Sequence, residues 1–120
     1  MNYLDSIKNK ILDHEMLKRM LALWKFKQYD VVFTNGCFDI LHLGHIDYLS
    51  KARGLGDLLI VGLNTDDSVS RIKGPERPVN KQEARAMLLA SLSFVDAVVL
   101  FDEDTPYELI KFIQPMLRTF

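Results

Sequence analysis

The chain has 120 residues, of which 48% are hydrophobic and 26% charged, with a formal net charge of −1. This length suits one domain with a sizeable core, and the balanced charge excludes a general attraction to nucleic acid or to an anionic membrane. A single cysteine excludes an internal disulfide, no apolar run approaches the roughly 20 residues of a membrane span, and no secretory signal is present, so we expect a cytoplasmic protein.

Residues 1–29 are predicted to form an N-terminal helical extension. Apolar residues recur at helical spacing from Leu4 to Trp24, which is the pattern of an amphipathic helix. The segment reads either as one helix or as two helices broken near Asp13 and His14. In both cases its expected role is to cover one side of a core.

Residues 30–120 alternate between strand and helix signals. Short apolar runs predict strands at 31–34, 58–63 and 97–101. Helical spacing and capping residues predict helices at 44–55, 65–71, 81–92 and from 104 onward, with a loop at 73–80 that concentrates Gly, Pro and charge. This order predicts a Rossmann-like, doubly wound α/β fold with a parallel sheet.

The segment between the first strand and the next helix is the candidate ligand site. In open parallel sheets, ligands bind beyond the carboxyl ends of the strands. The segment from Asn35 to Gly44 lies there, and the helix after it offers free N–H groups and a positive dipole end. Gly36 and Gly44 are expected to allow tight turns and a close approach of the backbone to the ligand.

His42 and His45 lie three residues apart at this helix start. Two imidazoles can donate hydrogen bonds to a polyphosphate and to the charge that develops at an attacked phosphorus. Nucleotidyl transfer needs mainly positioning and charge stabilisation, which such a pair supplies. A Walker-type loop and a dinucleotide GxGxxG motif are both absent from the sequence.

Three other roles for these histidines stay open at this stage. They could bind zinc together with Cys37 and Asp39, although no Cys-x-x-Cys pair supports this. They could cap the helix and serve structure alone. One of them could activate Cys37 as a nucleophile, but only the presence of these residue types supports this role. The flanking glycines in a strand-to-helix loop favour the phosphate-binding role.

The segment Thr34–His45 resembles the HxGH region of the cytidylyltransferase-like nucleotidyltransferases. Within that family, the sequence Asn-Gly-Cys-Phe-Asp resembles the corresponding segment of the adenylyltransferase domain of ADP-heptose synthesis. Three further blocks resemble that domain in the same order: 55–66, 71–80 and 101–106. The similarity extends from about Asp30 to Pro115.

The resemblance implies transfer of AMP from ATP to D-glycero-β-D-manno-heptose 1-phosphate, with Mg²⁺ assisting and pyrophosphate released. It implies His42, His45 and Lys73 as catalytic residues, and it places Thr34, Asn35, Gly36, Cys37, Phe38 and Gly44 with both histidines around the nucleotide. It implies that Asp39 either holds the loop or contacts the acceptor, and on the acceptor side it implies Asn64, Asp66, Lys73 and Arg85. It implies no metal ligand from the protein and a heptose 7-phosphate kinase as pathway partner.

The sequence departs from the family pattern at its C-terminus. Members continue with a strand and a later Ser/Thr-rich phosphate-binding motif, whereas residues 116–120 follow Pro115 here and the chain stops. We therefore expect a missing C-terminal strand and helix, weakened catalysis, and an exposed sheet edge that favours a homodimer. Two alternatives to the adenylyltransferase stay open: a cytidylyltransferase for glycerol 3-phosphate or a similar small phosphate, and a non-catalytic nucleotide-binding module.

Overall fold

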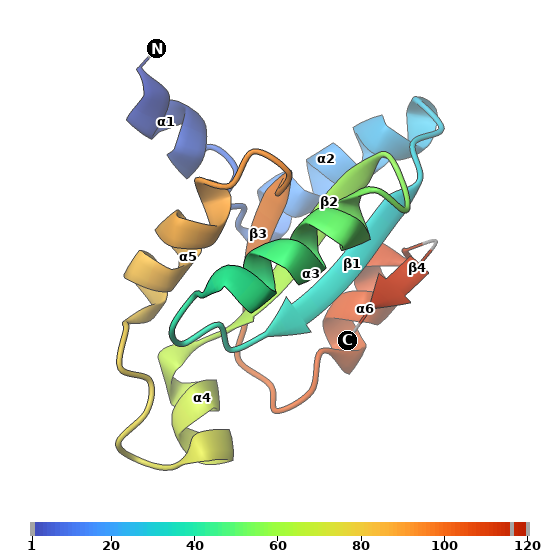
Figure 1. Ribbon diagram of the computed structural model, residues 1–120. Helices are drawn as coiled ribbons and strands as arrows, with labels where there is room; N and C mark the ends of the chain where they lie inside the picture. The colour runs from blue at the N-terminus through green and yellow to red at the C-terminus, as the bar shows by residue number, and fades with distance from the viewer. Residues whose placement is uncertain (1, 116, 120) are drawn as a thin grey trace.

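The computed structural model describes residues 2–115 and 117–119 and is an α/β layered fold (Figure 1). The elements of the N-terminal half are α1 (Tyr3–Lys8), α2 (His14–Phe26), β1 (Val31–Gly36), α3 (Leu43–Arg53) and β2 (Leu58–Asn64). Those of the C-terminal half are α4 (Asp66–Lys73), α5 (Gln82–Ala90), β3 (Ala97–Phe101), α6 (Tyr107–Ile113) and β4 (Leu117–Thr119). The predicted doubly wound fold is confirmed, with strand and helix ends shifted by a few residues.

All strand pairs in the sheet are parallel, and the strand order is β3-β2-β1-β4. The chain moves outward from β1 to β2 and β3, and it then returns through α6 to the other side of β1. The order of strands therefore reverses between β1 and β4, and such a switch point is where open parallel sheets bind ligands. The segment that follows β1 begins at this point.

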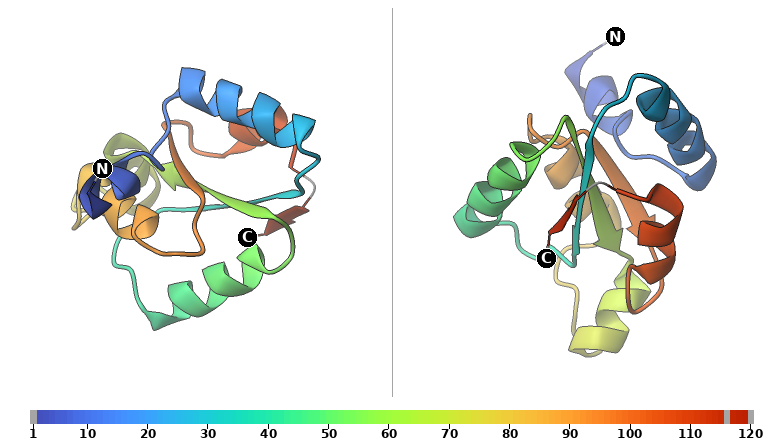
Figure 2. Two further views of the ribbon diagram at one scale, coloured as in Figure 1. Left: turned by 90° about the horizontal axis from the view of Figure 1, so that it is seen from above. Right: turned by 90° about the vertical axis from the view of Figure 1, so that its right-hand side faces the viewer.

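The helices cover both faces of the sheet (Figure 2). On one face, α3 and α5 pack over a core that includes Leu49, Leu59 and Leu89. On the other face, α2 and α6 pack over a second core that includes Leu17, Phe33 and Ile113. α4 lies beyond the carboxyl ends of the strands (Figure 1).

The N-terminal segment forms two helices with a break at residues 9–13, as the second of the two predicted arrangements has it. Asp13 caps α2 by accepting a hydrogen bond from the backbone N–H of Met16 at 2.8 Å. Between the helices, the backbone N–H of Leu12 bonds to the carbonyl of Val98 at 2.9 Å. Because Leu17, Leu21 and Trp24 are buried, α2 completes the core on its face of the sheet.

The expected absence of a strand after Pro115 is corrected by the structure. β4 pairs in parallel with Val32, Phe33 and Thr34 of β1, so the edge of β1 is covered over these residues. Sequence reasoning missed β4 because three residues carry almost no periodicity, whereas pairing with β1 needs only backbone groups. Two positions of that expectation, Met116 and Phe120, lie outside the described residues.

Candidate functional site

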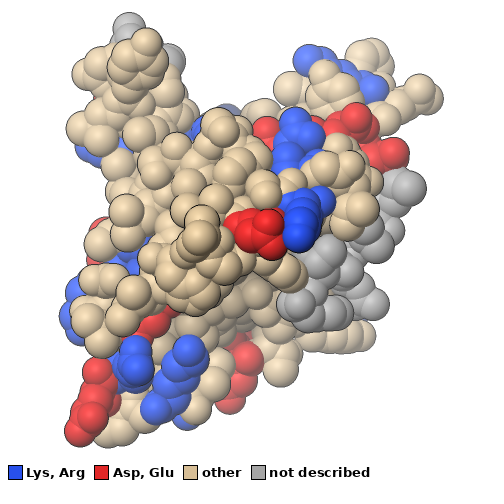
Figure 3. Space-filling view, viewed as in Figure 1, with Lys and Arg blue, Asp and Glu red and all other residues tan. Residues whose placement is uncertain are grey.

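A hollow of about 770 Å³ opens at the carboxyl end of β1. It is lined by Asn35, Gly36, Cys37, Phe38, Asp39, Ile40, His42, Gly44, His45, Tyr48, Lys73 and Arg77. Nine of the predicted site residues therefore line one hollow, eight of them from 35–45 and Lys73 from the end of α4. Positively charged side chains gather over α4 and the loop after it, interspersed with acidic ones (Figure 3).

His42 and His45 form a capping box at the start of α3. Nδ1 of His42 accepts the backbone N–H of Gly44 at 3.0 Å, and Nδ1 of His45 accepts the backbone N–H of His42 at 3.2 Å. The two rings stack with their centroids 3.9 Å apart. Both imidazoles thus satisfy backbone donors that a helix start leaves without partners.

This arrangement determines which nitrogen of each ring carries the proton. A nitrogen that accepts a hydrogen bond has no proton, so the hydrogen-bond pattern assigns the proton of each neutral ring to Nε2. Each Nε2–H is then a donor directed away from the helix backbone. Capping and ligand binding, which the sequence presented as competing roles, are compatible because they use opposite nitrogens of the same rings.

The backbone amides that were expected to bind the ligand are largely occupied. The N–H of Gly44 bonds to the His42 side chain, and those of His45 and Ile46 bond to the His42 carbonyl. Donors for an anion in the hollow are therefore the two Nε2–H groups and the basic side chains. The helix dipole still favours negative charge at this end.

Gly36 and Gly44 are needed because a larger residue at either position would collide with a neighbouring aromatic ring. Among the described residues, the glycine with positive φ is Gly74, at 111°. A Cβ on Gly36 would meet the Phe38 ring at 2.9 Å, and a Cβ on Gly44 would meet Cε1 of His42 at 2.9 Å. Phe38 in turn packs edge-on against His45, with ring centroids 5.2 Å apart. The glycines thus leave room for the rings that hold the two histidines in place.

Replacing Gly44 with alanine is expected to move the His42 ring and to reduce activity with little change in stability. The helix loses a cap worth about 1 kcal/mol and gains up to about 1 kcal/mol of helix propensity, so the two effects nearly cancel. Displacement of a positioned donor should lower the rate of the nucleotidyl transfer that the sequence resemblance implies roughly 10-fold or more. Urea denaturation and initial rates check the two halves of this prediction; a variant with unchanged rate would contradict it.

Burial lowers the pKa of His45 below its ordinary value of 6.5, and the electrostatic effects of the nearby His42 and Lys73 side chains lower it further. The imidazole is therefore neutral at neutral pH, as the capping bond to its Nδ1 requires. Lys73 lines the same hollow as His45, and its positive charge acts on the imidazole.

This shift predicts a pH dependence of stability. Because the unfolded chain takes up a proton on His45 at a higher pH than the folded chain does, the capping contribution is complete above about pH 7.5 and is lost as the pH falls below 6.5. The difference in unfolding free energy between the wild type and His45→Ala should therefore narrow from about pH 7.5 to about pH 5. Urea titrations across this range measure it, and a constant difference would refute the assignment.

Asp39 joins the loop after β1 to the loop after α4. Its carboxylate accepts hydrogen bonds from Nη1 of Arg77 at 2.6 Å and from the backbone N–H groups of Val79 and Asn80 at 2.8 and 3.1 Å. Burial raises the pKa of Asp39, but the bond from Arg77 and the two backbone bonds outweigh it and hold this pKa below its usual value. Asp39 is thus ionised and fully engaged.

Arg85 is completely buried, with a side-chain exposure of 0%. Its guanidinium donates to the carbonyls of Asn80, Cys37 and Asn64 at 2.9, 2.7 and 2.8 Å, and to the Asp66 carboxylate at 2.8 Å. The Asn64 side chain bonds to Ser68. Arg85, Asn64 and Asp66 therefore do not line the hollow and lie behind its wall, which the sequence could not show.

Three residues that line the hollow were not predicted as site residues: Ile40, Tyr48 and Arg77. Tyr48 lies one turn after His45 on α3, and its hydroxyl is 2.9 Å from Oγ1 of the buried Thr34. The spacing of three residues from His45 was the available signal. Arg77 could not be told from a solvated loop charge by sequence, because it is 38 residues away from its partner Asp39.

The hollow offers little for a protein-held metal ion. Mg²⁺ prefers carboxylate, water and phosphate oxygens, and the one carboxylate among the lining residues, Asp39, is engaged by three donors. Within residues 2–115 and 117–119, no group of three or more His, Cys, Asp or Glu is placed to hold a metal ion. The zinc alternative therefore lacks a ligand set in the described part of the chain.

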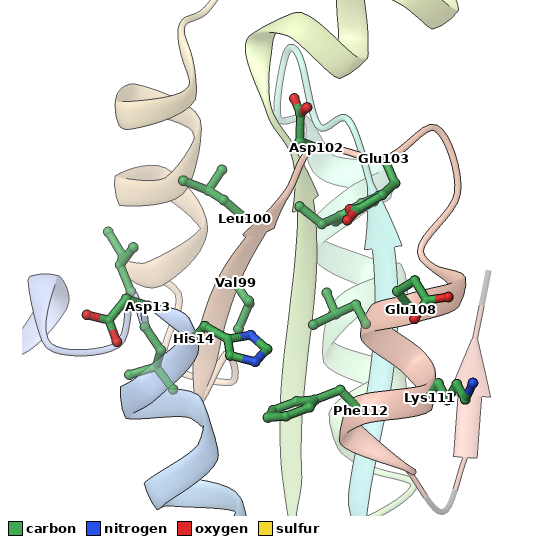
Figure 4. Close-up of a pocket in the computed structure, with 13 residues that line it drawn as sticks. Asp13, His14, Val99, Leu100, Asp102, Glu103, Glu108, Lys111 and Phe112 are labelled. Carbon is green, nitrogen blue, oxygen red and sulfur yellow. The ribbon is translucent and has the colours of Figure 1, made fainter.

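A second hollow of about 820 Å³ lies between α2 and α6 beside β3 (Figure 4). His14 and Phe112 point toward one another across it, with ring centroids 4.3 Å apart. It contains none of the predicted site residues. The hollow at the end of β1 is therefore the candidate site.

Comparison with known proteins gives a consistent result. The profile of the family described as Cytidylyltransferase-like matches residues 33–117. The Bifunctional protein HldE of Wolinella succinogenes is 55% identical over 106 residues, which cover 88% of this chain and 22% of that protein. That of Campylobacter jejuni strain RM1221 is 56% identical over 115 residues, covering 96% of this chain and 23% of that protein. The chain thus spans about a fifth of the length of these relatives.

A solved structure is also similar. The crystal structure of the lipopolysaccharide core biosynthesis protein from Thermoplasma volcanium GSS1 superposes with a TM-score of 0.69 at 35% identity, covering 77% of this chain and 74% of that one. In the described part of this chain, no helix is both long and apolar enough to span a bilayer.

Proposed function

The chain belongs to the cytidylyltransferase-like family of nucleotidyltransferases, and we propose that its hollow transfers AMP from ATP to D-glycero-β-D-manno-heptose 1-phosphate. The order of the four sequence blocks that resemble the ADP-heptose domain supports this acceptor. The identity to HldE proteins over most of this chain supports it as well.

The observation that carries the proposal is the pair of Nε2–H donors at the switch point of the sheet. Their orientation is imposed by the capping box, so no rotation or tautomer exchange is needed when a triphosphate binds. Preorganised donors of this kind stabilise developing charge at a small reorganisation cost. Lys73 and Arg77 also line the hollow and add positive charge to it.

In the proposed reaction, a phosphate oxygen of the acceptor forms a bond to the α-phosphorus of ATP. The bond from that phosphorus to the oxygen that bridges the α- and β-phosphates breaks, and its electron pair leaves with pyrophosphate. The two imidazoles and Lys73 hold the triphosphate and stabilise the charge on the leaving group. Mg²⁺ enters as part of the Mg·ATP substrate.

The proposal has three further parts: a pathway partner, a cellular compartment and an oligomeric state. A heptose 7-phosphate kinase is the proposed pathway partner, and the cytoplasm is the proposed compartment. A homodimer stays a prediction that sedimentation can check. The edge of β1 that motivated it is covered by β4 at Val32, Phe33 and Thr34.

Pyrophosphate release measured with four substrate pairs tests the proposal. Each of ATP and CTP is combined with heptose 1-phosphate and with glycerol 3-phosphate, in the presence of Mg²⁺. We expect pyrophosphate release from the pair of ATP and heptose 1-phosphate and from none of the other three pairs. Release with CTP and glycerol 3-phosphate would establish the cytidylyltransferase instead, and nucleotide binding without release from any pair would leave a binding module.

A further inference from the structure

Two buried charges of opposite sign hold the segment 73–81 against the loop after β1. Asp39, which is 6% exposed, extends from the first loop and binds Arg77, Val79 and Asn80. Arg85, which is 1% exposed, extends from α5 and binds the carbonyls of Asn80 and Cys37. Asn80 is held by both, since its side-chain amide also donates to the Asp39 carbonyl at 2.8 Å.

Lys73 stands at the start of this held segment. It is the last residue of α4, and Gly74 after it has φ 111°, a conformation that favours glycine. Its ammonium group has no hydrogen bond or ion pair to any residue that the structure describes, while its charge acts on His45. No polar contact of its own therefore fixes the Lys73 ammonium group, and its position depends on how the end of α4 and the segment after it are held.

We propose that Asp39 and Arg85 are positioning residues that keep Lys73 directed at the His42–His45 pair. This inference rests on the proposed function for its catalytic consequence, but its structural half can be measured without turnover. Neither residue needs to touch the substrate: the oxygens of Asp39 are engaged by protein donors, and Arg85 lies behind the wall of the hollow. For Arg85 this replaces the acceptor-side role that the resemblance implied, and for Asp39 it favours the loop-holding role over contact with the acceptor.

The geometry also explains why arginine stands at position 85. Its planar guanidinium reaches four acceptors in three segments at once, at the end of β1, at the end of β2 and before α5. A lysine carries the same charge but presents it as a compact group that cannot span this set. Arg85→Lys therefore keeps the buried charge and loses the bridge between the segments.

Tryptic cleavage of the Lys73–Gly74 bond measures the position of the segment without any substrate. We expect Asp39→Asn and Arg85→Lys to raise the rate of appearance of the 1–73 fragment about tenfold, because the segment opens locally more often. Arg53→Gln is the matched control, since it removes a partly buried ion pair to Asp96 at 2.9 Å that lies away from the hollow. Unchanged cleavage at Lys73 in both variants, or an equal rise in the control, overturns the proposal.

A double-mutant cycle with Lys73→Met tests the catalytic half. Asp39→Asn alone should lower kcat/KM for Mg·ATP between roughly 10- and 100-fold, and it should have almost no further effect once Lys73 is methionine. Losses that multiply would show that Asp39 acts independently of Lys73 and would overturn the proposal. If the wild type releases no pyrophosphate, the proposed function fails, but the tryptic cleavage rates still test the positioning role. If Arg85→Lys does not fold, the cleavage rate of Asp39→Asn tests that role by itself.

Discussion

The double variant His42→Asn, His45→Gln is expected to lose at least roughly 10³-fold in kcat/KM for pyrophosphate release, because each lost donor costs about 10²–10³-fold and paired effects add incompletely. Its stability should stay within about 1 kcal/mol of the wild type, since Asn is among the best N-cap residues and Gln at the third helical position completes a capping box. The variant thus removes both Nε2–H donors and retains the acceptors of the helix start. Initial rates and urea denaturation measure the two effects separately.

The matched control is His42→Ala, His45→Ala, which removes donors and caps together. It should lose similar activity and, in addition, about 1–2 kcal/mol of stability. If the His42→Asn, His45→Gln variant turned over at the wild-type rate, the two imidazoles would act only as caps of α3. The phosphate-binding role would then be wrong.

Lys73→Met is expected to reduce kcat and kcat/KM together by about 10²-fold, as the loss of an interaction made in the transition state does. Methionine keeps the length and apolar stem of the side chain and removes its charge. The same substitution at Lys51 is the control, because Lys51 forms an exposed ion pair with Asp47 on α3, with side-chain exposures of 76% and 63%, and such pairs contribute little. Steady-state kinetics with Mg·ATP measures both variants.

A rise in KM with unchanged kcat would give Lys73 a different role. The ammonium group would then hold the triphosphate equally in the ground state and the transition state. That outcome would contradict the assignment of Lys73 as a catalytic residue and would leave it as a nucleotide-binding one.

Local signals were sufficient for the parts of the fold that local chemistry determines. Leu58–Leu63 is apolar on both faces, so it could be placed as a central strand. The cap of α4 could be narrowed to Asn64 or Thr65, and in the structure it is Thr65, whose hydroxyl accepts the N–H of Ser68. The position of His42 and His45 beside the end of β1 followed from the same reasoning. β4 was missed because it depends on pairing with a distant strand.

The support of the site could not be predicted, because it depends on contacts between distant positions. Asp39 and Arg77 are 38 residues apart, and Arg85 and Cys37 are 48 apart. A single sequence shows which residues are charged, but it does not show that two of them are buried in one network. An arginine on a helix is more often at the surface, so Arg85 could only be placed by the structure.

The nitrogen-15 NMR spectrum of the three imidazoles tests the central claim most directly, because it reports which ring nitrogen carries the proton. We predict that His42 and His45 are Nε2–H tautomers at neutral pH, and that the Nε2 signals of both shift when a non-hydrolysable ATP analogue with Mg²⁺ is added. His14, which lines the other hollow, is the internal control and should not shift. Protons on Nδ1 of either ring, or Nε2 signals that the nucleotide leaves unchanged, would contradict the account.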